Sequence, residues 1–241
     1  MTAELFDEFP ALEDAHLCLA SGAALLRGFA RQKDVQLLQS FEEVIARAPL
    51  RHCITPGGYT MSIAMTNSGS LGWVSSLGGY KYERCDPLSG EPWPVMPTTW
   101  LELATSAAAQ AGFSDFKPDA CLINVYEPGS KLSLHQDKDE KDMTAPIVSV
   151  SLGLPAVFLF GGLRRSDKPQ QLRLCHGDVV VWGGPARLAY HGVKPLADGE
   201  HALTGRRRIN LTFRKASAMT SSLNLMLASK SPGTCRVSLQ S

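Results

Sequence analysis

The sequence predicts a mainly β fold with flanking helices (α+β), whose core is a double-stranded β-helix, or jelly-roll barrel. Short β-rich runs recur from residue 119 to residue 214, each bounded by Gly, Pro or Asp. Roughly eight runs follow one another without a helical pattern between them, which favours an antiparallel sandwich or barrel. Two amphipathic segments precede these runs, and we expect them to pack as helices outside the barrel.

The part of the chain before the core predicts a mixture of short elements. Residues 1–20 indicate an irregular lead-in, residues 22–29 a strand, and residues 32–48 an amphipathic helix. Over about residues 49–94, Gly-Gly and Pro-Gly pairs break the chain into segments typical of hairpins with aromatic tips. We interpret this part as a candidate lid, and residues 96–113 then predict the second helix.

The core runs predict the strands of a single domain over residues 21–214, with the jelly roll itself over residues 119–214. The runs are ACLINVY, KLSLHQD, APIVSVSLG, PAVFLFGG, QQLRLCHG, DVVVWGG, RLAYHGV and RINLTFR. After them, residues 215–241 are Ser-rich, poorly periodic and lightly charged. Such a composition predicts a disordered tail.

Composition narrows the class of protein. Lys plus Arg (24) nearly balance Asp plus Glu (23), so any contact with nucleic acid must come from a local patch. The six cysteines form no CxxC pair, which indicates neither a disulfide framework nor a zinc site. The acidic N-terminus and the lack of a long apolar run predict no signal peptide and no membrane span, hence a cytoplasmic protein. We expect a monomer, because no extended apolar stripe is left unassigned.

The stretch SLHQDKD carries the most informative chemistry. His135 and Asp137 stand two apart, so on a strand both side chains point to one side. A histidine from a later strand would complete a facial triad of two histidines and one carboxylate, which leaves open positions on Fe(II). His191, in Ala-Tyr-His-Gly, is the best candidate, and His176, at a Gly-Asp turn, is the weaker one. The alternative is that the pair is simply two polar residues at a strand end.

The run RINLTFR alternates strictly between polar and apolar residues. Its polar members share one face of a strand: Arg208, Asn210, Thr212 and Arg214. An ordinary half-exposed strand would show the same alternation. Beside a metal site, however, 2-oxoglutarate would chelate iron through its keto acid and needs a guanidinium fork at its distal carboxylate. Asn124 and Tyr126, two apart on an earlier strand, could add hydrogen bonds from the same cavity.

Seven segments in consistent order extend these observations over roughly residues 20–215. They are PGGYTMSIAMTNSGSLGW, PDACLINVY, GSKLSLHQDKDE, APIVSVSLGLPAVFLFGG, HGDVVVWGG, YHGV and RINLTFR. Together they resemble the bacterial AlkB family of nucleic-acid dealkylases. The C-terminal tail, the lead-in before residue 20 and the basic run at residues 206–208 depart from the family pattern, but none of them removes a ligand position.

The resemblance implies a role for individual residues. The implied iron ligands are His135, Asp137 and His191, and the implied 2-oxoglutarate-binding residues are Asn124, Tyr126, Arg208, Asn210 and Arg214. The implied substrate-contacting residues are Trp73, Tyr80, Tyr82, Asp139 and Arg165, and the lid would recognise the nucleotide. Alkylation of a ring nitrogen makes a base cationic, and aromatic faces and a carboxylate attract a cation.

The function that the resemblance implies is oxidative repair of alkylated bases. An Fe(II)- and 2-oxoglutarate-dependent dioxygenase would use O2 to demethylate 1-methyladenine or 3-methylcytosine, releasing formaldehyde, succinate and CO2. The expected partner is alkylated single-stranded or double-stranded DNA, with RNA as a further candidate; a base in a duplex must first be flipped out. Two alternatives remain open: an oxygenase acting on protein or a small molecule, and a cupin-like barrel that only binds a ligand.

Overall fold

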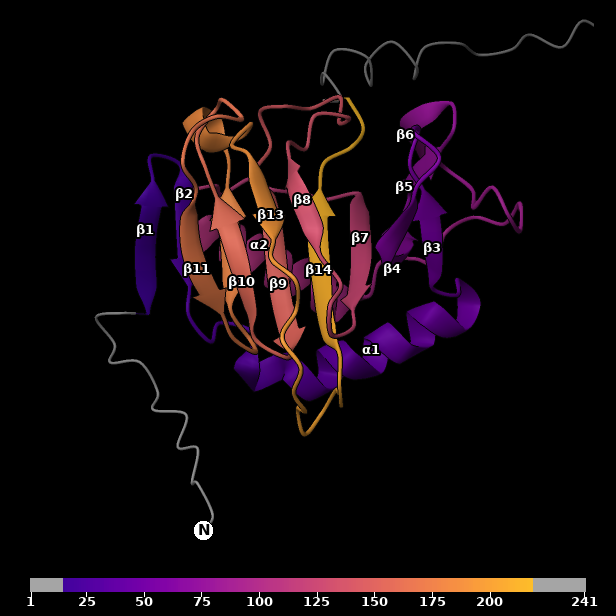
Figure 1. Ribbon diagram of the computed structural model, residues 1–241, viewed down its shortest axis with the longest axis horizontal. Coiled ribbons are helices and arrows are strands. Elements are labelled where there is room, and N and C mark those ends of the chain that lie inside the picture. Colours follow the sequence, from indigo (N-terminus) through magenta and orange to yellow (C-terminus); the bar gives the residue numbers. More distant parts are fainter. Residues whose placement is uncertain (1–14, 219–241) are drawn as a thin grey trace, which may run out of the picture.

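Two antiparallel sheets face each other in the computed structural model, which describes residues 15–218 (Figure 1). The larger sheet has eight strands. In spatial order they are β1 (His16–Ala20), β2 (Ala23–Leu26), β12 (Val179–Trp182), β9 (Ile147–Gly153), β14 (Arg208–Arg214), β7 (Ala120–Tyr126), β4 (Thr60–Gly69) and β3 (Arg51–Ile54). The central strands β7, β9 and β14 are buried along their whole length.

The smaller sheet has four strands and lies in front of the larger one in Figure 1. Its strands, in spatial order, are β11 (Gln170–Leu174), β10 (Ala156–Phe160), β13 (His191–Val193) and β8 (Leu132–His135). Apolar side chains of both sheets, such as Phe158 and Trp182, form one core between them. The jelly roll and all eight predicted core strands are therefore confirmed, although the two sheets stay separate and form no closed barrel.

Two helices cover the outer face of the larger sheet. They are α1 (Asp34–Arg47), which a short 3-10 turn, η2 (Arg31–Lys33), precedes, and α2 (Thr98–Gln110). Leu37 and Phe41 of α1 and Trp100 of α2 are fully buried in one cluster with outward-facing residues of the sheet. The Trp100 ring meets the edge of Phe213 at a centroid distance of 6.4 Å. The two predicted helices are confirmed, with slightly shorter bounds.

Strand β14 shows how alternation places polar groups inside the protein. Ile209, Leu211 and Phe213 belong to the cluster under the helices. The side chains between them therefore point into the space between the two sheets, because successive residues of a strand face opposite ways. Those inward side chains are Arg208, Asn210, Thr212 and Arg214, and all four are buried. The strand is not the half-exposed one that its alternation alone would also allow.

The lead-in and the tail differ from expectation where the structure describes them. Residues 16–20 form strand β1, paired with β2 through a turn at Gly22, so the irregular lead-in was wrong for this part. Only Leu19 of the strand is buried, which left little hydrophobic pattern to predict it. At the other end, Asp119 accepts a hydrogen bond from Ala216 and pairs with Lys215. Residues 1–14 and 219–241 lie outside the described part.

The candidate lid divides into two parts. Strand β4 pairs with β7 and so belongs to the larger sheet, with β3 beside it, because its inward residues Ile63 and Met65 join the core. Only β5 (Gly72–Ser76) and β6 (Gly79–Glu83) form a separate two-stranded hairpin, which stands at the far end of the sheet in Figure 1. Over residues 15–218, no helix is long and apolar enough to cross a membrane.

Candidate active site

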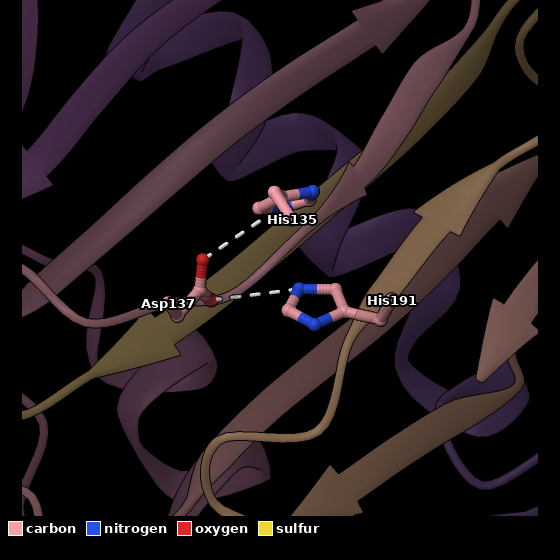
Figure 2. Close-up of side chains that lie close together, drawn as sticks. All are labelled: His135, Asp137 and His191. Carbon is pink, nitrogen blue, oxygen red and sulfur yellow. Dashed lines mark ion pairs between the residues drawn. The ribbon is translucent and has the colours of Figure 1, made fainter. Parts of the chain in front are cut away.

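Three side chains that could hold a metal ion meet between the two sheets. His135 ends β8 and His191 begins β13, and these two residues are directly paired across the smaller sheet. The Nε2 atoms of His135 and His191 lie 3.6 and 3.8 Å from the two carboxylate oxygens of Asp137 (Figure 2). One ligand atom from each residue lies within 4.8 Å of the others. Among the described residues, these three form the one group of His, Cys, Asp or Glu side chains that is close enough to hold a metal ion together.

The ring orientation of both histidines is fixed by main-chain carbonyls. Nδ1 of His135 lies 2.9 Å from the oxygen of Ser133, and Nδ1 of His191 lies 3.0 Å from that of Ala189. A carbonyl only accepts, so each Nδ1 carries the proton and each Nε2 keeps a free lone pair. Burial, together with the neighbouring His135, lowers the pKa of His191 to about 4, so its ring is neutral at neutral pH. Both rings therefore present the form that binds a metal.

Arg214 holds the carboxylate of Asp137 in its charged form. Its Nε and Nη2 atoms donate to Oδ2 of Asp137 at 2.9 and 2.7 Å. Burial alone would raise the pKa of Asp137, but the guanidinium and the two histidines hold it well below its usual range. In this structure Arg214, expected at the cosubstrate, thus directly contacts a metal-ligand candidate.

Arg208 is a buried cation that pairs with no carboxylate within residues 15–218. Its side chain is 1% exposed, and its guanidinium stacks over the Tyr126 ring at 4.9 Å. Nη2 donates to the hydroxyl of Ser151 at 2.9 Å, whereas Nε and Nη1 have no hydrogen-bond partner among the described residues. Burial lowers the pKa of this guanidinium, although Tyr126 opposes the shift. A buried guanidinium with free N–H groups indicates a position for a carboxylate.

Asn210 and Asn124 line the same space from β14 and β7. The amide nitrogen of Asn210 donates to Ser149 and to the main chain of Val150, and its oxygen accepts from Thr212 and, at 3.4 Å, from Asn124. The oxygen of Asn124 is buried without a partner among the described residues. Asn210 therefore has its bonds within the protein, while Asn124 keeps an acceptor free.

One cavity of about 640 Å³ joins these groups to the surface. The residues predicted for the metal and the cosubstrate all line it: His135, Asp137, His191, Asn124, Tyr126, Arg208, Asn210 and Arg214. Four of the five predicted substrate residues line it as well: Trp73, Tyr80, Asp139 and Arg165. The residues predicted from the sequence, apart from Tyr82, therefore line a single cavity in the folded protein.

The substrate candidates form the outer part of this cavity. The rings of Trp73 and Tyr80, on the two strands of the hairpin, stack with centroids 5.1 Å apart. Nε1 of Trp73 donates to the exposed carboxylate of Asp139 at 3.0 Å. Arg165 is exposed, with its guanidinium 5.9 Å from the ring of Tyr190. Tyr82 is different, because it is not among the lining residues.

Comparison with known proteins assigns this geometry to a family. A family model described as the 2OG-Fe(II) oxygenase superfamily matches residues 22–214. The Escherichia coli K12 protein "Alpha-ketoglutarate-dependent dioxygenase AlkB" is 56% identical over 212 residues, which cover 88% of this chain and 98% of that protein. The chain belongs to the AlkB family. The Salmonella typhimurium protein of the same name is 57% identical over 199 residues, or 83% of this chain and 92% of that protein.

A solved structure gives the same answer for the fold. "The structure of OsALKBH1" superimposes with a TM-score of 0.72 at 28% identity, covering 83% of this chain and 99% of that one. The protein "tRNA demethylase abh1" of Schizosaccharomyces pombe is 39% identical over 160 residues, or 60% of this chain and 52% of that protein. As a member of the AlkB family, this protein is an Fe(II)- and 2-oxoglutarate-dependent dioxygenase.

The residues of the site fit both groups that the AlkB family uses. Two Nε2 lone pairs and one ionised carboxylate are the donor set of a facial triad, which leaves coordination positions for cosubstrate and O2. The free N–H groups of Arg208 and the free oxygen of Asn124 can pair with a bound dicarboxylate. The ligand-only barrel is therefore excluded as a description of this protein.

Several supporting residues were not predicted from the sequence. Arg187 donates through Nη1 to the main chain of Asp137 at 2.7 Å and through Nη2 to Glu140 at 3.0 Å. Glu140 is buried and also accepts the hydroxyl of Tyr82 at 2.7 Å. Neither charge stands in a pattern that would separate it from surface residues, so no signal could have found them.

His176, the weaker candidate ligand, lies away from the metal cluster. Its Nε2 atom is 3.0 Å from a carboxylate oxygen of Asp34 at the start of α1, and its Nδ1 accepts from the main chain of Gly153. Both ring nitrogens are thus used in packing the helix against the sheet. The structure therefore favours His191 over His176 as the third ligand.

Proposed function

We propose that this oxygenase removes alkyl groups from N-alkylated bases of DNA, with RNA as a second substrate, and that it acts as a monomer. The observation that carries the proposal is the cavity mouth, where Trp73 and Tyr80 stack and the Asp139 carboxylate lies beside them. A cationic base such as 1-methyladenine or 3-methylcytosine is attracted both to aromatic faces and to a carboxylate. An uncharged base lacks this attraction.

The chain's own residues divide the work along the cavity. The outer group, Trp73, Tyr80 and Asp139, would receive an unstacked base, and Arg165 would contact a phosphate. The inner end would hold the cosubstrate on Arg208, Asn124 and Tyr126. A base in a duplex must be flipped out to enter, so a single strand or a weakened damaged pair is the easier substrate.

The metal ligands would be His135, Asp137 and His191, kept in their binding forms by their hydrogen bonds. Bound iron, 2-oxoglutarate and O2 supply the oxidation of the alkyl carbon, with succinate and CO2 as products. The hydroxylated carbon would then leave as formaldehyde: its bond to the base nitrogen breaks, the bonding pair returns to the nitrogen, and the hydroxyl proton is released to solvent. Arg214 and Arg187 keep Asp137 charged and oriented through these steps.

The direct test uses a single-stranded oligonucleotide that carries 1-methyladenine or 3-methylcytosine. Purified protein is incubated with it, Fe(II) and 2-oxoglutarate, and the oligonucleotide is weighed by mass spectrometry. We expect the loss of one methyl group's mass, and no loss when either cofactor is left out. Succinate formation without base repair would show an oxygenase with another substrate, such as protein or a small molecule.

Replacing Asp137 with Asn tests the metal assignment. The amide removes the negative ligand and the partner of Arg214 while keeping the shape, so we expect demethylation to fall by on the order of a hundredfold or more. Asp167→Asn is the matched control, because its carboxylate pairs with the exposed Arg164 outside the cavity. A folded Asp137→Asn protein with normal succinate formation and repair would contradict the assignment.

A further inference from the structure

The hairpin that carries Trp73 and Tyr80 needs attachment to the rest of the protein. A two-stranded hairpin is marginally stable by itself. Here β5 and β6 pair only with each other, so side chains must join them to the body. Ser75 donates to the main chain of Ile54, and Trp93 donates through Nε1 to the main chain of Glu83. Neither of these contacts involves Trp73.

Asn67 makes the contact that holds Trp73. Its amide oxygen accepts from the main-chain N–H of Trp73 at 2.9 Å, and its amide nitrogen donates to the main-chain oxygen of Trp73, also at 2.9 Å. This pair of bonds imitates the exchange between two strand residues. Asn67 is 3% exposed and lies on β4, in register with Leu122 of the larger sheet. The amide therefore ties Trp73 directly to the rigid sheet.

Only an amide of this length meets both requirements. One end must accept and the other must donate, so a carboxylate would face the carbonyl of Trp73 with a second acceptor. Removal of the side chain would leave a main-chain donor and acceptor in a largely buried place. The Cβ of Asn67 also lies 2.8 Å from the position that a Cβ on Gly72 would occupy, which shows how closely the two strands approach.

Trp73 separates two cavities, so the position of its indole depends on this anchor. It lines the active-site cavity on one side. On the other side lies a second cavity of about 470 Å³, which Asn67, Val74 and Leu88 also line. Its stacking partner Tyr80 is 44% exposed. The bonds to Asn67 fix the main chain of Trp73 between these two spaces, and from that backbone position the indole reaches Asp139 and Tyr80.

We propose that Asn67 is a positioning residue that fixes Trp73, and thereby the gap in which the substrate base is held. The inference rests on the proposed function for the role of Trp73 at the substrate. It concerns the base and not the cosubstrate, because the side chain of Asn67 bonds to Trp73 and is not among the described residues that line the cavity around Arg208. Loss of the contact between Asn67 and Trp73 should weaken binding of the methylated base and leave binding of 2-oxoglutarate unchanged.

Kinetics with Asn67→Asp and Asn67→Ala test the role. We expect the KM for a 1-methyladenine oligonucleotide to rise by on the order of tenfold, because Asn67→Ala loses both hydrogen bonds and Asn67→Asp loses one and sets its carboxylate against the Trp73 carbonyl. The KM for 2-oxoglutarate and the substrate-free formation of succinate should stay within about twofold. Ser70→Ala, which removes a hydroxyl that donates to the main chain of Asp119, is the control and should change neither. An unchanged oligonucleotide KM in both variants, or an equal rise in the 2-oxoglutarate KM, would overturn the proposal.

A double-mutant cycle with Trp73→Ala separates positioning from general support of the fold. If Asn67 acts through the indole, Asn67→Ala should cost little more once the indole is gone. Additive losses would mean that Asn67 does not act through Trp73.

Hydrogen exchange tests the contact between Asn67 and Trp73 without relying on catalytic activity. The main-chain amide of Trp73 should exchange faster in Asn67→Ala than in the wild type, with no substrate present, because alanine removes the oxygen that accepts from this amide. If the wild type repairs no oligonucleotide, the proposed function fails, while faster exchange would still show that Asn67 holds Trp73. Exchange that does not change would overturn the positioning role itself.

Discussion

At the scale of single residues, the charged groups of the site differ in whether they already have an oppositely charged partner. The carboxylate of Asp137 already has Arg214 as its partner, whereas the part of the chain that the structure describes gives Arg208 only a hydroxyl and an aromatic ring. A buried cation that lacks an anion is unfavourable unless a ligand supplies one. The unpaired charge of Arg208 therefore lowers the stability of the free protein, and a bound dicarboxylate would supply the missing anion.

Replacing Arg208 with Lys should weaken cosubstrate binding specifically. Lysine keeps the charge but loses the planar fork, the stacking on Tyr126 and the bond to Ser151. We expect the KM for 2-oxoglutarate to rise by on the order of tenfold or more, which corresponds to about 1.4 kcal/mol. Steady-state assays of succinate formation measure this value. Arg206→Lys, at an exposed pair with Asp198, is the control; equal KM values for both variants would argue against a carboxylate at Arg208.

At the scale of elements, the pairing of strands brings the ligands together. His135 and His191 come from β8 and β13 and stand opposite each other because these strands are neighbours in the smaller sheet. Asp137 follows β8 directly, and β14 of the larger sheet supplies the arginines from across the core. The hairpin β5–β6 is the exception, since it is held at its base by close packing and by side-chain bonds.

Replacing Gly72 with Ala should disturb that base. The new Cβ would lie 2.4 Å from the Trp93 ring and 2.8 Å from the Cβ of Asn67, and Trp93 is buried. We expect a loss of about 1–3 kcal/mol in unfolding free energy, as for other overpacked sites. Chemical denaturation measures it. Gly78→Ala is the control at the tip of the same hairpin, where the nearest atom is 3.5 Å away; a similar loss there would show that close packing at Gly72 is not the cause.

At the scale of the whole molecule, ligand binding and stability are linked through the space between the sheets. The free groups of Arg208 and Asn124 belong to residues that line the cavity between the two sheets. A ligand that satisfies them binds the folded state and not the unfolded chain, so it raises the free energy of unfolding.

Mn(II) with 2-oxoglutarate should therefore raise the Tm measurably. At about 100 times Kd the stabilisation is about 2.7 kcal/mol, or roughly 5–10 °C for a domain of this size. Differential scanning fluorimetry measures the shift. Glutarate, which has both carboxylates but no keto group, should give a smaller rise, because it cannot chelate the metal through a keto acid. An equal rise with glutarate would indicate that the metal takes no part in binding.

Local patterns determined much of this protein. The eight core strands, both helices and the inward face of β14 follow from periodicity, because each depends on neighbours along the chain. The His-x-Asp spacing indicated two ligands on one side, and the described structure brings His191 to them.

Only the tertiary structure decided which distant groups meet. It joined β4 to the larger sheet, turned Tyr82 to Glu140 and placed Arg214 on Asp137. It also chose His191 over His176, which packs against Asp34. The physical reason is that these contacts depend on strand pairing and burial between residues far apart in the chain, whereas periodicity reports only which way a side chain faces.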